Sequence, residues 1–145
     1  MRIIIEDAPE DLALEIAALI GRHASHESVT LNADWTVPRA EMLLRDLPTT
    51  AGRLIREAVL GDGWAAAERL RGADGSGSLR GRSGAITKAI TRGTVAGRWP
   101  DGMPSPVQAQ YDPDVPSYQR TVGYRMADDL VTVFRAAMDR IDRKV

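Results

Sequence analysis

Proline and glycine divide this 145-residue sequence into separate segments. Pro48 interrupts one apolar pattern, and Gly61-Asp62-Gly63 ends the next. The run 72–77 has the composition of a loop, and prolines and a glycine punctuate residues 100–106. Proline removes a helix donor and glycine favours turns, so each position marks a boundary between elements. The sequence therefore predicts a fold made of short helices and strands.

Composition excludes several classes of protein. The chain is 43% hydrophobic and 27% charged, which is the usual globular mixture, and its length fits one domain or one small domain with an added arm. It has no cysteine, so disulfides, thiolate nucleophiles and cysteine-ligated zinc are ruled out. No apolar run approaches the roughly 18 residues that a membrane span needs. With no secretory signal pattern at its start, the chain is expected to be cytoplasmic.

Residues 1–47 have the pattern of a separate arm. Arg2–Ile5 is β-branched, a helix is expected from Asp7 to about His23, and Ser28–Leu31 indicates a second short strand. A further helix is expected over residues 39–47. Such a β-α-β unit has open sheet edges that a second copy of the chain would complete. We therefore expect the arm to form a homodimer.

The remaining residues alternate between helical and strand periodicity. Helices are expected from a cap at Thr49 or Thr50 to residue 60, over 64–70, and from a cap at Ser78 or Ser83 to about Trp99. Residues 107–111 and 118–126 alternate as the strands of a hairpin, and a last helix begins near Asp128. Acidic side chains lie at the N-terminus of this helix and basic side chains at its C-terminus, which is the favourable arrangement for the helix dipole.

The helix expected over 78–99 separates into two faces when its residues are placed at about 100° each. The apolar or small side is expected to be buried, and it comprises Leu79, Ile86, Ala89, Ile90, Gly93 and Gly97. The opposite side is expected to be exposed, and it comprises Gly84, Lys88, Thr91, Arg92 and Val95. The small residues on the exposed side would not obstruct entry into a groove.

Charge is distributed unevenly although the net charge is −1. Residues 1–50 contain four basic and nine acidic side chains, whereas residues 75–126 contain seven basic and three acidic ones. Between 75 and 100 there are five basic side chains and no acid. Such asymmetry is an argument about binding partners and not about fold. The basic stretch also fits the solvated face of a helix, and this alternative remains open. All but two of the basic residues are arginine, a bias typical of GC-rich bacterial genomes.

The order helix, helix, basic helix, hairpin, helix resembles the winged helix-turn-helix family. Ser78–Trp99 would be its recognition helix and Val107–Met126 its wing, so the resemblance covers about two-thirds of the chain. The C-terminal part is also similar to winged-helix domains of uncharacterised actinobacterial proteins. The expected fold class is α+β, with an N-terminal β-α-β arm over 1–47 and a winged helix-turn-helix domain over 48–145.

The resemblance implies a regulator that binds double-stranded DNA through the major groove. Its candidate contacts are Arg80, Arg82, Ser83, Thr87, Lys88, Thr91, Arg92, Arg98 and Arg120. Lys88 and Arg92 would reach base edges or phosphates, and Thr91 could contact either. Replacing both Lys88 and Arg92 with alanine is expected to abolish binding without unfolding the protein.

Two departures from the family pattern favour an alternative. The connection after Leu70 is longer than the usual turn, and Asp112 and Asp114 at the wing tip would repel phosphates. Winged helices also serve as protein-interaction modules, so an adaptor that binds no DNA is the second hypothesis.

Catalytic and metal chemistry has little support in the sequence, and no cofactor, catalytic residue or metal ligand is expected. His23 and His26 have a spacing that could hold a metal, but a histidine at a helix C-terminus explains the first of them more simply. The acidic cluster over residues 6–11 fits helix capping and solvation. Gly81-Arg82-Ser83-Gly84 has the wrong residue order for a phosphate loop. A small enzyme or metal-binding protein is the third hypothesis.

Overall fold

The chain forms two compact units in a computed structural model that describes residues 6–23, 32–71, 79–114 and 120–143. The first unit is Met1–Asn32 and the second is Ala33–Val145. The second unit therefore begins before the predicted boundary at residue 48, because Trp35 and Leu43 belong to its core. The expected strands at 2–5 and 28–31, and the loop at 72–77, lie outside the described residues.

The first unit contains helix α1, Glu10–His23, which ends where predicted but begins three residues after Asp7, so the predicted cap at Asp7 is wrong. Glu10 and Asp11 occupy its first turn, where carboxylates stabilise the positive end of the helix dipole. Leu12 and Leu19 on its apolar side are 45% and 50% exposed. This helix is amphipathic, and its leucines are only half covered.

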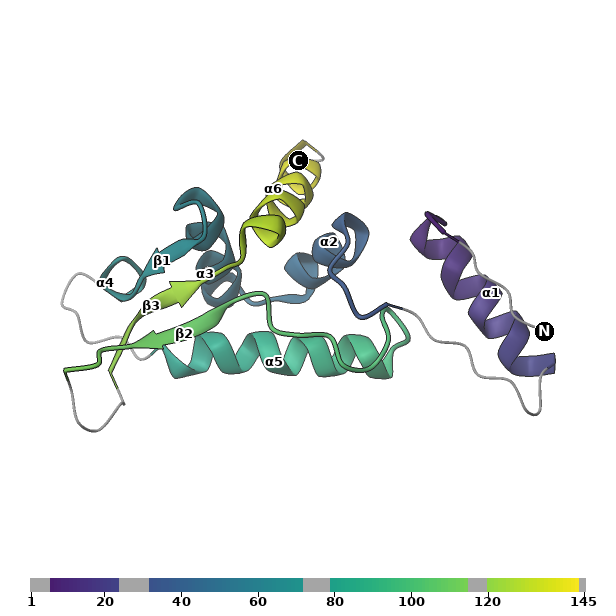
Figure 1. Cartoon of the computed structure of the whole chain (residues 1–145), viewed down its shortest axis with the longest axis horizontal. Coiled ribbons are helices and arrows are strands. Elements are labelled where there is room, and N and C mark those ends of the chain that lie inside the picture. Colours follow the sequence, from purple (N-terminus) through teal and green to yellow (C-terminus); the bar gives the residue numbers. More distant parts are fainter. Residues whose placement is uncertain (1–5, 24–31, 72–78, 115–119, 144–145) are drawn as a thin grey trace. The chain divides into compact units, whose positions relative to one another are not determined.

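The second unit combines helices with a small antiparallel sheet, so the protein is of the α+β class. Its elements in order are α2 (Val37–Asp46), α3 (Thr49–Leu60), β1 (Trp64–Ala66), α4 (Ala67–Leu70), α5 (Arg80–Val95), β2 (Gln108–Tyr111), β3 (Thr121–Arg125) and α6 (Asp128–Arg143). Figure 1 shows α5 running along one side of this unit, while α2, α3 and α6 gather on the other. Helix α2 packs mainly on α6, and α3 packs on α5, α6 and β1.

The sheet has the order β1-β3-β2, with both neighbouring pairs antiparallel. The predicted hairpin is the pair β2 and β3, in which Ala109 lies opposite Tyr124. Tyr124 is buried, and its hydroxyl donates to the carbonyl of Leu79 at the start of α5. This contact fixes the hairpin beside the first turn of α5.

An aromatic cluster forms the centre of the core. The ring of Trp35 meets the ring of Trp99 edge-on with centroids 5.4 Å apart, and it lies 5.6 Å from the ring of Phe134. Both indoles donate to backbone carbonyls, Trp35 to Pro104 at 2.7 Å and Trp99 to Ile90 at 2.9 Å. Because buried indole N–H groups need partners, these bonds fix the orientation of both rings.

The helix predicted over 64–70 is wrong for its first half. Trp64–Ala66 form strand β1, and only Ala67–Leu70 make one helical turn. Trp64 pairs with Arg125, whose guanidinium lies 5.7 Å from the indole centroid. Tertiary pairing with β3 overrides the helical preference of the alanines in this segment.

The predicted helix caps were also wrong. Pro48 is the residue before α3 and supplies no side-chain cap, so neither Thr49 nor Thr50 has that role. Leu79 precedes α5, and the Ser83 hydroxyl donates to the carbonyl of Arg80 instead of capping. Helix α2 does have a side-chain cap, in which Thr36 accepts from the N–H of Arg39.

Helix α5 ends four residues earlier than expected, at Val95. Gly97 has a φ of 75°, a conformation that glycine adopts without strain, and it reverses the chain so that Trp99 lies back against the helix. Gly97 is therefore exposed and not part of the buried side. The rest of the predicted buried side is confirmed, since Leu79, Ile86, Ala89 and Ile90 are buried together with Gly93.

We expect Gly93→Ala to destabilise the protein by about 1–3 kcal/mol, because a Cβ there would overlap the enclosed ring of Trp99. Gly84→Ala is the matched control, since no atom lies within 4 Å of the added Cβ. It should stabilise α5 by up to about 1 kcal/mol through helix propensity. Urea unfolding measures both, and equal effects would contradict the packing described here.

Candidate nucleic-acid interface

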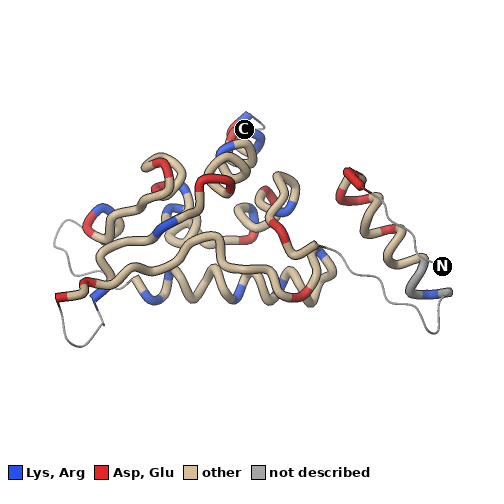
Figure 2. The backbone as a smooth tube through the Cα atoms, in the orientation of Figure 1, with Lys and Arg blue, Asp and Glu red and all other residues tan. Residues whose placement is uncertain are grey.

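The exposed side of α5 contains the central residues predicted to contact DNA. Lys88, Thr91 and Arg92 are all exposed, and Val95 continues this face with 84% of its surface accessible. Arg80 is exposed at the start of the same helix, about 12 Å from Lys88 along the axis. Figure 2 shows Lys and Arg at intervals along α5, and no acidic residue lies on it.

Two glycines on this helix have no packing function. Nothing lies within 4 Å of a Cβ built at Gly81 or at Gly84, in contrast to Gly93. A glycine inside a helix costs about 1 kcal/mol relative to alanine. Such a cost without an internal reason is typical of a surface that another molecule approaches closely.

Arg92 and Arg98 are both held by Asp46, the last residue of α2. The Asp46 carboxylate Oδ2 accepts from Arg92 Nε at 3.2 Å and from Arg92 Nη2 at 3.1 Å. Arg98 Nη1 lies 3.4 Å from the same oxygen. Two arginines that were predicted to contact DNA thus pair with the carboxylate of Asp46, a residue that was not among the predicted site residues.

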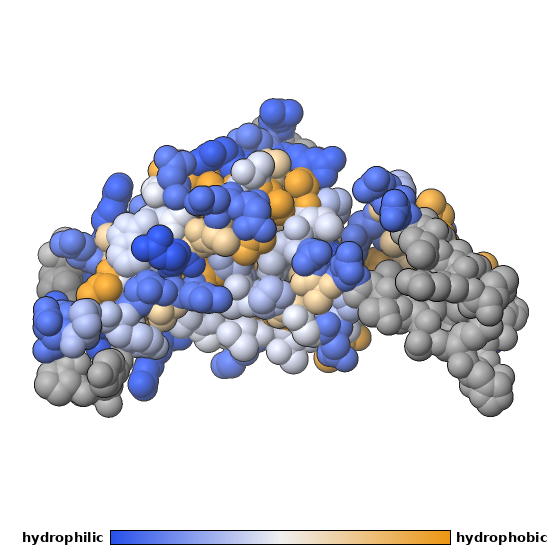
Figure 3. All heavy atoms as spheres, viewed as in Figure 1, coloured by the Kyte–Doolittle hydropathy of each residue, from blue (hydrophilic) through white to orange (hydrophobic). Residues whose placement is uncertain are grey.

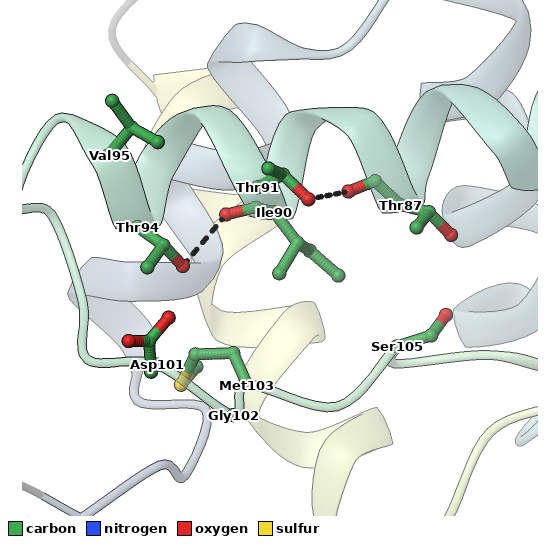
Figure 4. A pocket seen from close by; sticks show the side chains of 9 residues that line it. All are labelled: Thr87, Ile90, Thr91, Thr94, Val95, Asp101, Gly102, Met103 and Ser105. Atoms are coloured by element: carbon green, nitrogen blue, oxygen red, sulfur yellow. Dashed lines mark hydrogen bonds between the residues drawn. The ribbon is translucent and has the colours of Figure 1, made fainter.

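The predicted threonines line a cavity of about 330 Å³ between α5 and the segment that follows it (Figure 4). The Thr87 hydroxyl donates to Ser83 O, and the Thr91 hydroxyl donates to Thr87 O. Each hydroxyl has only one proton, so both threonines offer acceptors but no donor to a ligand. They suit the amino groups of adenine or cytosine better than a phosphate.

The cavity itself is mainly apolar. Ile90 and Met103 are almost completely buried there, and Thr94 donates its proton to Ile90 O. Among the lining side chains only Asp101 carries a charge. The lining contains no basic side chain that could attract an anion.

Arg82 does not share the exposed face of Lys88. It lies close to the angular position of Ile86, is only partly exposed, and its Nη1 is enclosed without a hydrogen-bond partner. Ser83 is also partly exposed, with its proton directed to Arg80 O. The structure therefore places Arg82 on the side of Ile86 and Ser83 between the two sides, so neither lies on the exposed face of Lys88.

The hairpin contributes charges of both signs near its tip. Arg120 is exposed and directly precedes β3, and its carbonyl accepts from the N–H of Asp112. The Asp112 carboxylate accepts from the N–H of Asp114 at 2.9 Å, so it stabilises its own turn. Residues 115–119 of the tip lie outside the described part of the chain.

Most other arginines of the second unit are engaged. Those that contact a carboxylate or a backbone carbonyl are Arg39, Arg45, Arg53, Arg56, Arg69, Arg71, Arg135 and Arg140. By contrast, the Arg80 and Lys88 side chains form no ion pair or hydrogen bond with any residue in the described ranges. They are the exposed cations of α5 that lack a partner there, whereas Arg82, whose Nη1 also has none in these ranges, is partly buried.

Hydrophilic side chains cover most of the visible face of the second unit, with smaller hydrophobic areas between them (Figure 3). No group of three or more metal-binding side chains occurs among the residues that the structure describes, and His26 is outside them. Within the same ranges no helix is long and apolar enough to cross a membrane. Gly81–Gly84 is part of α5 and therefore forms no phosphate loop.

Comparisons of the chain with protein-family models, with curated proteins and with solved structures found no match.

We expect Asp46→Asn to lower the free energy of unfolding by less than about 1 kcal/mol. The Arg92 and Asp46 side chains are 52% and 28% exposed, and exposed ion pairs are screened by water and salt. Thermal unfolding at low and high salt measures the effect. A loss several times larger would mean that this pair is an essential link between α2 and α5.

Proposed function

We propose that this protein binds double-stranded DNA, with the exposed face of α5 in the major groove, and acts as a transcriptional regulator. The observation that carries the proposal is the pairing pattern of the cations. Arg80 and Lys88 are free on a helix without acids, while most other arginines of the unit are engaged. Free cations beside open glycines suit an approaching phosphate backbone.

The winged helix-turn-helix fold is part of this proposal. The order α3, α4, α5, hairpin β2–β3 and α6 is compatible with it. In that fold α5 is the recognition helix and the hairpin is the wing, and recognition helices place their N-terminal residues at base edges. The two free cations lie at the start and in the middle of α5, and Arg80 has the N-terminal position that this assignment requires.

Each residue of the face has a distinct role in the proposed complex. Arg80 and Lys88 neutralise phosphates or donate to guanine, and Gly84 between them allows the backbone to come close. Thr87 and Thr91 accept from exposed amino groups of bases. Arg120 contacts the flanking phosphates from the hairpin.

The first unit is proposed to form a homodimer. Helix α1 has half-exposed Leu12 and Leu19, with Glu10 and Asp11 in its first turn and Arg22 in its last. If two copies of α1 pack in antiparallel orientation, Glu10 and Asp11 of each copy lie beside Arg22 of the other, and Leu12 and Leu19 are covered. A dimer would present two recognition helices one DNA turn apart, or a multiple of it.

The main test is fluorescence anisotropy with a mixed-sequence duplex over a salt series. We expect binding that weakens with salt, and a logarithmic slope that becomes shallower by about 2 in the variant Arg80→Ala/Lys88→Ala. The control Arg53→Ala/Arg143→Ala removes the same charge outside α5 and the hairpin. If the logarithmic salt slopes of the two variants were equal, α5 would not be part of the DNA interface.

A second test separates binding from stability. We expect Gly84→Leu to weaken duplex binding at least tenfold, because the side chain would fill the space between Arg80 and Lys88. Leucine is a good helix former, so the free energy of unfolding should not fall. Unchanged affinity in this folded variant would mean that DNA does not approach α5 closely.

The dimer is tested by sedimentation of the full chain at micromolar concentrations. We expect the dimer to dissociate in Leu12→Asp/Leu19→Asp, because charges replace the apolar contacts of α1. Leu60→Asp, at a residue 73% exposed in the second unit, should leave it intact. A monomeric wild-type chain would contradict this part of the proposal.

The alternative, a protein-interaction module without DNA binding, rests on the acidic hairpin residues Asp112 and Asp114. If this alternative holds, the protein shows no salt-dependent binding to any DNA duplex. Absence of binding at low salt would favour it over the regulator.

A further inference from the structure

Asp46 occupies a position that its own helix does not favour. It is the last residue of α2, where the helix dipole is negative and an acidic side chain is repelled. Arg45 beside it has the favourable sign and pairs with Glu41 within the helix. The reason for an acid at position 46 must therefore lie outside α2.

The partners of Asp46 are the two predicted DNA contacts nearest the end of α5. Arg92 reaches the carboxylate through two nitrogens and also lies 3.4 Å from the Asp46 carbonyl. Arg98 follows the helix and meets the same carboxylate oxygen. A single negative charge is shared by two guanidinium groups, which leaves the trio with a net charge of +1.

The pairing shortens the part of α5 that offers free cations. Arg80 and Lys88 span about 12 Å of the helix, and Arg92 would extend this length by one turn, about 6 Å. With Arg92 and Arg98 engaged by Asp46, phosphates beside the last turn of the helix meet one net positive charge in place of two free guanidinium groups.

The ion pairs are also weak enough to compete with phosphate. The side chains of Arg92 and Arg98 are 52% and 37% exposed, and exposed pairs contribute about 1 kcal/mol or less. A carboxylate and a phosphate compete for the same guanidinium donors. The charge on Asp46 therefore acts directly on any anion that approaches Arg92.

We propose that Asp46 is a specificity-determining residue that restrains Arg92 and Arg98 and thereby limits sequence-independent binding to the DNA backbone. This inference rests on the proposed DNA-binding function. Phosphate contacts supply most non-specific affinity, whereas base contacts supply specificity. Because Asp46 keeps two arginines from binding phosphates, the residues of α5 that face the major groove contribute a larger share of the binding free energy.

The test is a mutant cycle in the full chain, measured by anisotropy with a mixed-sequence duplex over a salt series. Asp46→Asn should bind at least tenfold more tightly at about 0.1 M salt, with a logarithmic slope steeper by about 2. Arg92→Ala/Arg98→Ala should change little in the wild-type background. The same pair of substitutions should cancel the gain when it is combined with Asp46→Asn.

Asp62→Asn is the matched control, because it removes one acid that pairs with Arg135 on α6 and changes the net charge equally. Unfolding curves verify that each variant is folded, and Asp46→Ser replaces Asp46→Asn if that variant does not fold. If wild type binds but Asp46→Asn matches Asp62→Asn, the inference fails and the proposed function stands. If wild type and Asp46→Asn both fail to bind at low salt, both proposals fail.

Discussion

The aromatic contact between Trp35 and Trp99 is the interaction on which the rest of the second unit depends. It connects the segment before α2 with the segment after α5, and Phe134 brings α6 to the same point. The bond from Trp35 to the carbonyl of Pro104 fixes the return of the chain beside α5. Because Gly93 has no side chain, the Trp99 ring lies directly on the helix. The core therefore determines which side of α5 remains exposed.

That exposed side owes its charge pattern to neighbouring elements as much as to its own sequence. Read alone, α5 is basic along its whole length. In the fold, Asp46 of α2 pairs with Arg92, so the free exposed cations of α5 lie between its start and its middle. The distinction between free and engaged cations separates Lys88 from Arg92, although both lie on the same exposed face.

The sequence was sufficient for elements that depend on local chemistry. The dipole-ordered ends of the last helix, the two faces of α5 and the alternation of the hairpin strands all predicted observed structure. Prediction from the sequence failed where contacts between distant residues determine the structure. Trp64–Ala66 form a strand because they pair with β3. Trp99 is not part of α5, because the chain reverses at Gly97. For the candidate site, the exposed face could be predicted from periodicity. The pairing of Arg92 with Asp46 could not, because 46 residues separate the partners.

The most direct measurement of the central claim is the salt dependence of duplex binding by the full chain, compared with Arg80→Ala/Lys88→Ala. We expect affinity that falls steadily between about 50 and 200 mM salt, with a shallower slope in the variant because it makes fewer phosphate contacts. Absence of binding at the lowest salt, or an identical salt dependence in both proteins, would contradict it.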